Sequence, residues 1–172
     1  MADDLAQIAL NQEWRRLETQ LLARPHSVEE LTGALIGAVY CQNLEMTRQL
    51  LEAGANPNRS FDGSECPAMT TAVEQTWQSG LELLIAHGGD VNVRKYGGWT
   101  PLLHAVDTVA DRARQVGTPV SLDLLRFLLA QGADPSVRDD QGLSAADVAR
   151  LYHWEEAAQL LAKAEQGPRI NP

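Results

Sequence analysis

A short pattern of residues occurs three times along the chain, and it limits the possible folds more than any other feature. Each copy has two aliphatic residues, a glycine three positions later, a small residue, and then Asn or Asp. The glycines are 34 and then 44 positions apart, and a fourth unit ends in Leu160–Lys163 without its own glycine. Repetition at such a period predicts stacked structural units, because one unit alone cannot bury its hydrophobic face. The three copies are Leu50–Asn58, Leu84–Asn92 and Leu128–Ser136.

The residues around this pattern predict a pair of helices in each unit. The aliphatic pair ends an amphipathic helix, and the glycine can adopt the left-handed conformation that closes it. Asn or Asp then supports a turning backbone, and Gly98 and Gly142 mark a second, tight turn. Thr100 followed by Pro101 is a good start for a helix. Ser144–Asp147 has the form of a capping box, with Asp in place of Glu or Gln.

Two segments together resemble the ankyrin repeat, whose period is about 33 residues. They are Gly98–Ala105, which reads Gly-Trp-Thr-Pro-Leu-Leu-His-Ala, and Leu128–Pro135, which reads Leu-Leu-Ala-Gln-Gly-Ala-Asp-Pro. The resemblance covers residues 31–164 and implies an all-α fold, an ankyrin-repeat solenoid of stacked helix–turn–helix units with short hairpin-like loops. The expected units are 31–61, 62–95, 96–139 and 140–164, the last being a C-terminal cap.

The units depart from the family pattern in different ways. The first has Gly33–Ala38 where Thr-Pro-Leu-His is expected, so we expect its first helix to lack the usual cap. The second has an offset version at Cys66–Ala72. The third is longer by about ten residues, and we expect a lengthened first helix, a loop broken at Gly117 and Pro119, and a next helix capped by Ser121. The insertion, residues 107–120, fits either a functional role or neutral drift of a tolerated surface loop.

The two ends of the chain lie outside the repeats. Residues 1–30 are expected to form an N-terminal capping helix region, because Leu10, Trp14, Leu17 and Leu21 follow helical spacing and predict one helix over 4–23. This helix would cover the apolar side of the first repeat. Ser27–Glu30 then forms a capping box for the next helix. Residues 165–172 are expected to be a flexible tail.

The charge of the chain excludes one class of partner and favours another. The net charge is -9, with 14 Lys and Arg against 23 Asp and Glu, which argues against nucleic acid. A protein partner, basic or neutral, is favoured instead. The acidic start does not resemble a signal peptide, and no stretch approaches the roughly 18 apolar residues of a membrane span. We therefore predict a cytoplasmic protein without a membrane partner, monomeric when free, whose two cysteines are structural thiols.

The sequence holds no recognisable catalytic arrangement. It has no phosphate-binding Gly-Lys-Ser or Gly-Lys-Thr, no HExxH and no GxSxG. His104 lies where the resemblance implies an imidazole that bonds the turn backbone, and His153–Glu156 spans a helix junction rather than one helix face. We predict that the chain is not an enzyme and has no catalytic residue, cofactor or metal.

The resemblance implies a concave binding surface built from the loop tips and the exposed faces of the first helices. Aromatic and Arg side chains often dominate binding energy, which favours the tip residues; Trp99 packing on its own tip, and the helix residues forming an ordinary solvated face, are the alternatives. The candidates on the tips are Arg59, Phe61, Arg94, Lys95, Tyr96, Trp99 and Arg138, and those on the first helix of the third unit are Asp107, Asp111, Arg112 and Arg114.

These observations predict a non-catalytic module that binds a partner protein, such as an adaptor. An alternative is a stoichiometric inhibitor, for example an immunity protein that blocks a toxin or another enzyme. A third interpretation is a secreted effector that acts on host proteins. The sequence does not name the partner, and the fold alone does not separate these roles.

Overall fold

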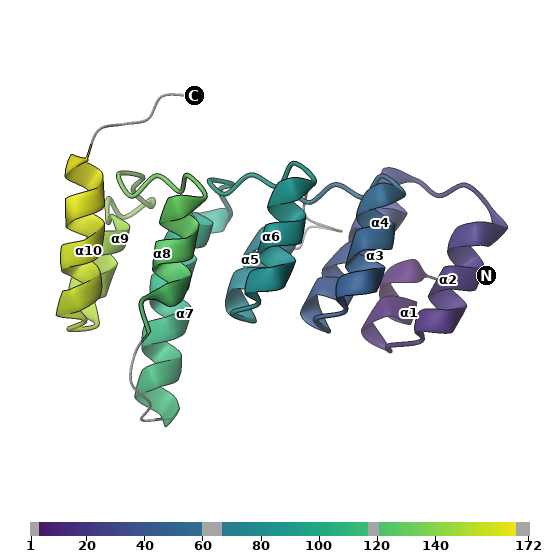
Figure 1. Cartoon of the computed structure of the whole chain (residues 1–172), viewed down its shortest axis with the longest axis horizontal. Coiled ribbons are helices and arrows are strands. Elements are labelled where there is room, and N and C mark those ends of the chain that lie inside the picture. The colour runs from purple at the N-terminus through teal and green to yellow at the C-terminus, as the bar shows by residue number, and fades with distance from the viewer. Residues whose placement is uncertain (1–3, 60–66, 117–120, 168–172) are drawn as a thin grey trace. The chain divides into compact units, whose positions relative to one another are not determined.

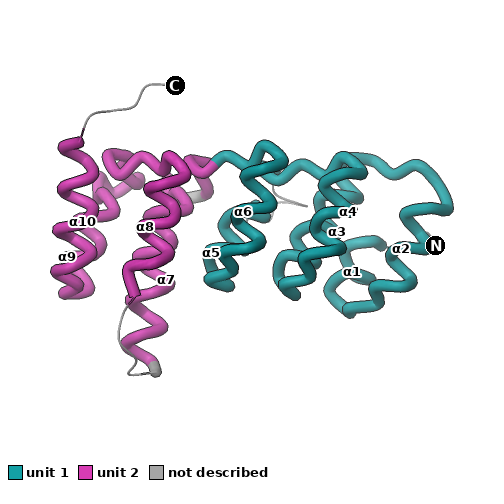
Figure 2. The backbone as a smooth tube through the Cα atoms, in the orientation of Figure 1, with its two compact units in different colours: residues 1–90 teal, residues 91–172 magenta. Residues whose placement is uncertain are grey.

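The protein is all-helical in the part that the structure describes. The computed structural model describes residues 4–59, 67–116 and 121–167, and these contain ten α-helices and one 3₁₀ turn. Extended pairing in the same residues is confined to an isolated bridge between Arg138 and Ser144. The chain divides into two compact units, unit 1 (residues 1–90) and unit 2 (residues 91–172), shown in Figure 2.

Unit 1 consists of three pairs of antiparallel helices (Figure 1). The first helices of the pairs form one layer, because α3 packs against both α1 and α5, and in the second layer α4 packs against α6. Leucine and methionine side chains, among them Leu35, Met46, Leu50 and Met69, are fully buried between the layers. The helices are α1 (Leu5–Leu10), α2 (Trp14–Ala23), α3 (Val28–Tyr40), α4 (Leu44–Glu52), α5 (Ala68–Glu74) and α6 (Gln78–Ala86).

Unit 2 contains two further pairs, preceded by a 3₁₀ turn in a loop. Here α7 packs against α8 within its pair and against α9 of the next pair. Leu102, Leu103, Leu125 and Leu128 are fully buried. The elements are η1 (Tyr96–Gly98), α7 (Pro101–Val116), α8 (Asp123–Ala130), α9 (Ala145–Leu151) and α10 (Glu155–Gln166).

Asparagine side chains join the loops of successive pairs within each unit. In unit 1 the Asn58 amide donates to the Gly88 carbonyl at 2.9 Å and accepts from the Asp90 N–H at 2.7 Å. In unit 2 Asn92 makes the same two bonds, to the Gly132 carbonyl at 3.1 Å and from the Asp134 N–H at 2.8 Å. Units 1 and 2 therefore contain the same asparagine hydrogen bonds between successive loops, in addition to their buried helix layers.

The glycines that close the second helices behave as the sequence predicts. Gly54, Gly88 and Gly132 have φ values of 104°, 86° and 89°, in the left-handed region that favours glycine. Gly98 and Gly142, which mark the tight turns, also have positive φ, at 75° and 80°.

The prediction of a single N-terminal helix over residues 4–23 is wrong. The chain reverses between α1 and α2, where Gln12 has a φ of 59° and the N–H of Glu13 donates to the Ile8 carbonyl at 3.1 Å. Gln42 and Thr76 occupy the same place between α3 and α4 and between α5 and α6, with φ values of 55° and 49°. The N-terminal region is thus a further helix pair with the same turn as the repeats.

Three predicted helix starts can be compared with the structure. The predicted capping box of Ser27 with Glu30 is confirmed, and it starts α3 at Val28. Gly33–Ala38, where the usual cap was expected to be missing, lies inside this helix. The Ser144 capping box with Asp147 is confirmed. So is the start at Pro101, where the Thr100 hydroxyl accepts from the Leu103 N–H at 3.4 Å.

The lengthened helix of the third unit is also confirmed, because α7 has 16 residues. Gly117 and Pro119 lie outside the described residues. The Ser121 hydroxyl accepts from the Asp123 N–H at 3.1 Å, although Leu122 is the residue at the N-cap of α8. At the other end of the chain, α10 continues to Gln166, so residues 165 and 166 are helical rather than part of a flexible tail.

Candidate protein-binding surface

The two loop tips of unit 2 are bonded to each other through their backbones. The Lys95 N–H donates to the Trp99 carbonyl at 2.9 Å and closes the first tip, and the Asp140 N–H donates to the Gly97 carbonyl at 2.9 Å. Arg94 spans the same two tips, because its guanidinium donates to the Arg138 carbonyl at 3.0 Å. Arg94 and Arg138 therefore lie on adjacent, bonded tips, and Lys95 closes the first tip through its backbone; a binding role for these residues stays a prediction.

The Arg138 side chain is bonded within unit 2. Its guanidinium donates to the Gly142 carbonyl at 3.0 Å and to the Asp147 carboxylate at 3.1 Å, and lies 3.8 Å from Glu165. The backbone N–H and hydroxyl of Ser144, and then Arg138, lower the pKa of Asp147. Arg138 thus joins the second tip to α9 and α10.

The Trp99 indole packs on its own loop and helix. It meets the imidazole of His104 edge to face, with ring centroids 5.8 Å apart, and a Cβ on Gly97 would lie 3.5 Å from its ring. Trp99 is half-buried, as in the alternative in which it packs on its tip. The side chain of Tyr96 lies outside what the structure describes.

Two candidates belong to unit 1. Arg59 is exposed and forms an ion pair with Glu29 at 2.9 Å across the loop and the first turn of α3. Phe61 lies outside the described residues. A contact role for Arg59 and Phe61 therefore stays a prediction.

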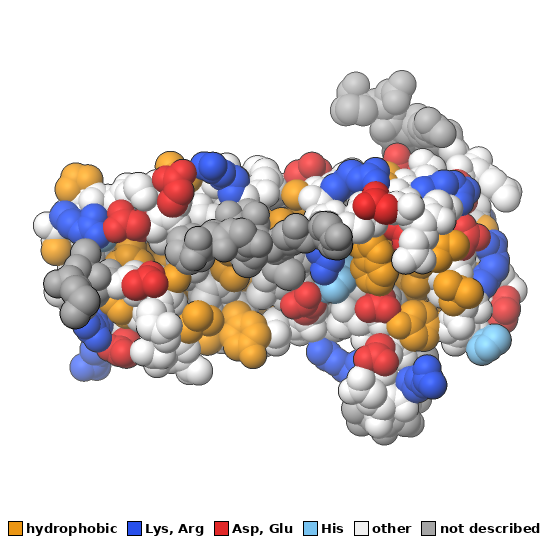
Figure 3. Space-filling view, turned by 180° about the vertical axis from the view of Figure 1, so that it is seen from behind, with side chains coloured by type: hydrophobic (Ala, Val, Ile, Leu, Met, Phe, Trp, Pro, Cys, Tyr) orange, Lys and Arg blue, Asp and Glu red, His pale blue; other side chains and the backbone are white. Residues whose placement is uncertain are grey.

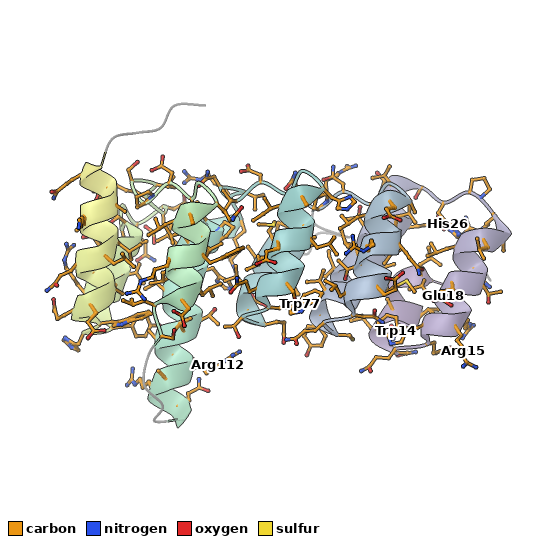
Figure 4. All side chains as sticks on the ribbon, viewed as in Figure 1. Trp14, Arg15, Glu18, His26, Trp77 and Arg112 are labelled. Atoms are coloured by element: carbon orange, nitrogen blue, oxygen red, sulfur yellow. The ribbon has the colours of Figure 1, made fainter. Side chains whose placement is uncertain are left out.

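The remaining candidates lie on α7, where the acidic and the basic residues differ in their surroundings. Asp107 accepts a 2.5 Å bond from the hydroxyl of Tyr152, at the end of α9, and Asp111 accepts a 2.5 Å bond from Gln115. Arg112 and Arg114 are exposed farther along the same helix (Arg112 is labelled in Figure 4). The two acids thus accept hydrogen bonds within unit 2, and the two arginines have exposed side chains.

Tyr152 was missing from the predicted surface. The bond to Asp107 and burial raise the pKa of Tyr152 to about 12. Its position offers one sequence signal: it directly precedes His153, whose φ of 57° places it at the left-handed position of the turn between α9 and α10. Its partner Asp107 lies on α7, the first helix of the preceding pair, nine residues before the end of that helix at Val116.

Three further features of the described residues concern metal binding, thiol reactivity and membrane crossing. They contain no group of three His, Cys, Asp or Glu side chains placed to hold a metal. Burial raises the pKa of the Cys41 thiol, which makes that sulfur a poorer nucleophile at neutral pH. No helix in the described part combines the length and the apolar character needed to cross a membrane.

Comparison with known proteins decides the family. A model described as ankyrin repeats in three copies matches residues 35–139, more than half of the chain. The chain belongs to the ankyrin repeat family. Ankyrin repeats are generally protein–protein interaction modules, and the family is generally non-catalytic.

Individual relatives are similar over parts of their length. The ankyrin repeat protein YahD of Escherichia coli K12 is 34% identical over 131 residues, which is 73% of this chain and 61% of that protein. An ankyrin repeat-containing protein of Treponema pallidum is 33% identical over 63% of this chain and 33% of its own length. The human 2-5A-dependent ribonuclease is 37% identical over 41% of this chain and 10% of its own length. The chain thus spans less than two thirds of each of these relatives.

Proposed function

We propose that this ankyrin repeat protein is a non-catalytic module that holds a partner protein against the α7 side of unit 2. The surface consists of the loop tip 94–99 and the α7 extension, which we define as residues 107–116. One observation supports the choice most directly: α7 has 16 residues, whereas α9, the first helix of the next pair, has 7. The extension therefore continues beyond what packing against α9 requires.

The exposed residues of the extension have the chemistry of a contact surface. Arg112 and Arg114 are exposed, and Arg is among the side chains that most often dominate binding energy. Asp107 is fixed by Tyr152 on α9, so the base of the extension is held in place before a partner arrives. A rigid surface binds at a smaller entropic cost than a mobile one.

The partner proposed here is a protein with acidic groups at the contact and a neutral or basic charge as a whole. The acidic groups would pair with Arg112 and Arg114, and the net charge of -9 would speed the approach of a basic protein. We place this complex in the cytoplasm and propose a monomer for the unbound chain, which fractionation and sedimentation would check. An adaptor and a stoichiometric inhibitor would use the same surface, so the identity of the partner separates them.

Photo-crosslinking in cells of the source organism tests the surface. A photoreactive phenylalanine replaces Arg112 in one variant and Arg126 in a control; Arg126 is also an exposed arginine of unit 2, with its side chain 62% exposed, but it lies on the second helix α8. We expect a specific protein adduct at residue 112 and none at residue 126, with the partner identified by mass spectrometry. Adducts at both positions, or at residue 126 alone, would overturn the proposed surface.

The purified partner then gives a quantitative test. Replacing both Arg112 and Arg114 with Ala should weaken binding at least tenfold without lowering the melting temperature, because neither side chain is buried. Arg126→Ala should leave the affinity within twofold. If the partner also loses an enzymatic activity at one-to-one stoichiometry, the chain is an inhibitor; if the activity persists, it is an adaptor.

A further inference from the structure

The loop between α2 and α3 contains a buried histidine that the proposed function does not use. His26 lies in this loop and is labelled in Figure 4. Its side chain is only 3% exposed, whereas His87, in the same unit, is an exposed residue. The groups around the two ring nitrogens of His26 therefore determine which protonation states of the imidazole fit the fold.

Each ring nitrogen of His26 faces an oxygen acceptor. Nε2 lies 2.9 Å from the backbone carbonyl oxygen of Gln20, and it must carry a proton to donate there. Nδ1 is buried and has no hydrogen-bond partner among the described residues, and it lies 3.8 Å from the Oε2 atom of Glu30. The ring thus stands between a carbonyl of α2 and a carboxyl group of α3.

A neutral imidazole cannot donate to both oxygens. It has one N–H, so either the Gln20 carbonyl or the Glu30 carboxyl group faces a lone pair instead of a proton. The shorter contact assigns that proton to Nε2 and leaves Nδ1 without one. In the doubly protonated ring both nitrogens donate, and Nδ1 needs to move only about 1 Å to reach hydrogen-bond distance of Oε2. The imidazolium is therefore the form that satisfies both acceptors.

Glu30 stays ionised over the pH range in which histidine gains its second proton. The Arg24 guanidinium donates to both of its carboxylate oxygens, and the Ser27 N–H donates to Oε2 at 2.9 Å. These bonds, with that from Arg24 first, hold the pKa of Glu30 at about 2. An unperturbed imidazole gains its proton near about pH 6.5. Glu30 is thus a full negative charge whenever the ring is charged.

The other charges near the ring form balanced pairs. Arg24 pairs with Glu30, and Arg59 pairs with Glu29 at 2.9 Å. Figure 3 shows acidic and basic side chains next to one another on unit 1, which lies at the left of that view. Burial and the Arg24 cation oppose a second proton on His26, whereas the Glu30 carboxylate favours it.

The α2 side of the ring also favours a cation. The last turn of α2, Gln20–Ala23, contains no charged residue. His26 donates to a carbonyl of this turn, and the dipole of a helix attracts positive charge at its C-terminal end. The ring therefore lies between the negative end of one helix and an ionised carboxylate of the next.

The bonds of His26 carry weight because α2 has little buried surface of its own. Among its ten residues, which the structure describes in full, only Leu17 is buried, and Leu22 is 89% exposed. A helix of this length is marginal by itself in water. Contacts that hold its C-terminal end to α3 should therefore determine how often the whole helix opens.

We propose that His26 is a pH-sensitive latch between α2 and α3 of unit 1. At neutral pH the ring donates once, to the Gln20 carbonyl. On acidification Nδ1 takes up a proton from water, the ring also donates to Glu30, and α2 is held more firmly; the second bond is lost again as the pH rises. The latch uses neither the tip 94–99 nor the α7 extension, so it and the proposed binding surface can each fail alone.

Hydrogen exchange of the α2 amides tests the latch in the full-length protein. Exchange is measured at about pH 5 and about pH 8, on either side of the histidine range, and corrected for the intrinsic dependence of the rates on pH. We expect the α2 amides to be about two- to fivefold better protected at the lower pH, the effect of one partly exposed ion pair. Equal protection at both pH values, or weaker protection at the lower one, would overturn the proposal.

Two variants separate His26 from the other titratable groups. His26→Gln keeps an amide donor for the Gln20 carbonyl but cannot gain a charge, so its α2 amides should be equally protected at both pH values. His87→Gln removes an exposed histidine of the same unit and should keep the two- to fivefold difference of the parent. A difference that survives in His26→Gln would belong to another group and would contradict the latch.

The ring itself can be observed in the parent protein, whether or not His26→Gln folds. Long-range ¹H–¹⁵N spectra should show the proton of the neutral ring on Nε2, and protons on both nitrogens at about pH 5. The Nδ1 proton should exchange slowly with water, because the ring is buried and bonded to Glu30. A neutral ring protonated on Nδ1, or an Nδ1 proton that exchanges as fast as that of His87, would show that the junction does not work as proposed.

Discussion

Two turns in different units have nearly the same backbone and a tryptophan at the same place, but the two tryptophans differ in burial. Trp77 precedes α6 with φ and ψ of -94° and 84°, and Trp154 precedes α10 with -94° and 77°. The preceding residues, Thr76 and His153, both have positive φ, at 49° and 57°. Yet Trp77 is half-buried, whereas Trp154 is only 7% exposed.

The difference follows the residue one helical turn later. After Trp77 this residue is Gly80, and the indole occupies the space that a Cβ would need. After Trp154 it is Ala157, which is fully buried and whose methyl group fills that space. The Trp154 ring must lie elsewhere, and it becomes part of the core. The backbone conformation of the turn is therefore nearly the same in both units. The residue three positions after the tryptophan determines whether the ring is half-buried or part of the core.

Replacing each tryptophan with Ala tests this comparison most strongly. Trp154→Ala should lower the free energy of unfolding by about 3–5 kcal/mol, the usual cost of removing a buried large aromatic side chain. Trp77→Ala should cost clearly less, because part of its ring already contacts water. Urea unfolding followed by circular dichroism measures both. Equal losses would mean that the two rings contribute equally to the free energy of unfolding, against the comparison.

The sequence predicted the parts of the fold that local rules control. The left-handed residues at Gly54, Gly88 and Gly132 were predictable because glycine adopts that conformation without strain. The turn at Gln12 was not predicted because a glutamine side chain has no property that favours a positive φ. There the packing of α1 on α3, and of α2 on α1, determines the conformation, against the residue's own preference.

The candidate surface was predictable to a smaller extent, for a related reason. Arg94 and Arg138 were correctly placed on adjacent tips, but the acceptors of their guanidinium groups are carbonyls that only the folded loops bring near. The bond between Asp107 and Tyr152 joins residues 45 positions apart. Such a pair depends on which helices become neighbours and on the side-chain rotamers that they allow. A local sequence pattern determines neither.

The turn of unit 2 is anchored to the preceding first helix by Tyr152, and removing its hydroxyl should have the second largest effect. Tyr152→Phe should cost about 1 kcal/mol near neutral pH, because a partly exposed hydrogen bond to a carboxylate is lost. The corresponding anchor in unit 1 is the Gln42 bond to the Gln75 carbonyl. Gln42→Ala should cost less, since that bond is exposed and neutral, and equal costs would contradict the comparison.

The same bond predicts a dependence on pH. The folded state raises the pKa of Tyr152 from 10.0 to about 12, so its contribution to stability is complete below pH 10 and disappears as the pH rises toward 12. Titration of the tyrosinate absorbance should show one group ionising near pH 12 that is absent in Tyr152→Phe. If the variant and the parent lose stability equally over this range, the hydroxyl does not carry the effect.

Gly80→Ala places alanine three positions after Trp77, as Ala157 stands three positions after Trp154. Alanine favours a helix over glycine by up to about 1 kcal/mol, but in the parent chain the indole must leave its place, so we expect no net gain. In a Trp77→Ala background the gain should reappear, which gives a coupling of about 1 kcal/mol in a double-mutant cycle. The same gain in both backgrounds would show that the position of the indole does not require glycine at residue 80.

The smallest expected effect concerns the residue with positive φ in each turn. Thr76 is β-branched at a φ of 49°, where side chains of its kind are strained more than the unbranched Gln42 at 55°. Replacement by glycine removes the strain but adds disorder to the unfolded chain. We therefore expect Thr76→Gly to raise the free energy of unfolding by about 0.5–1 kcal/mol and Gln42→Gly to raise it less. Destabilisation by Thr76→Gly would mean that the 2.8 Å bond from its hydroxyl to the Gln75 carbonyl outweighs the backbone strain.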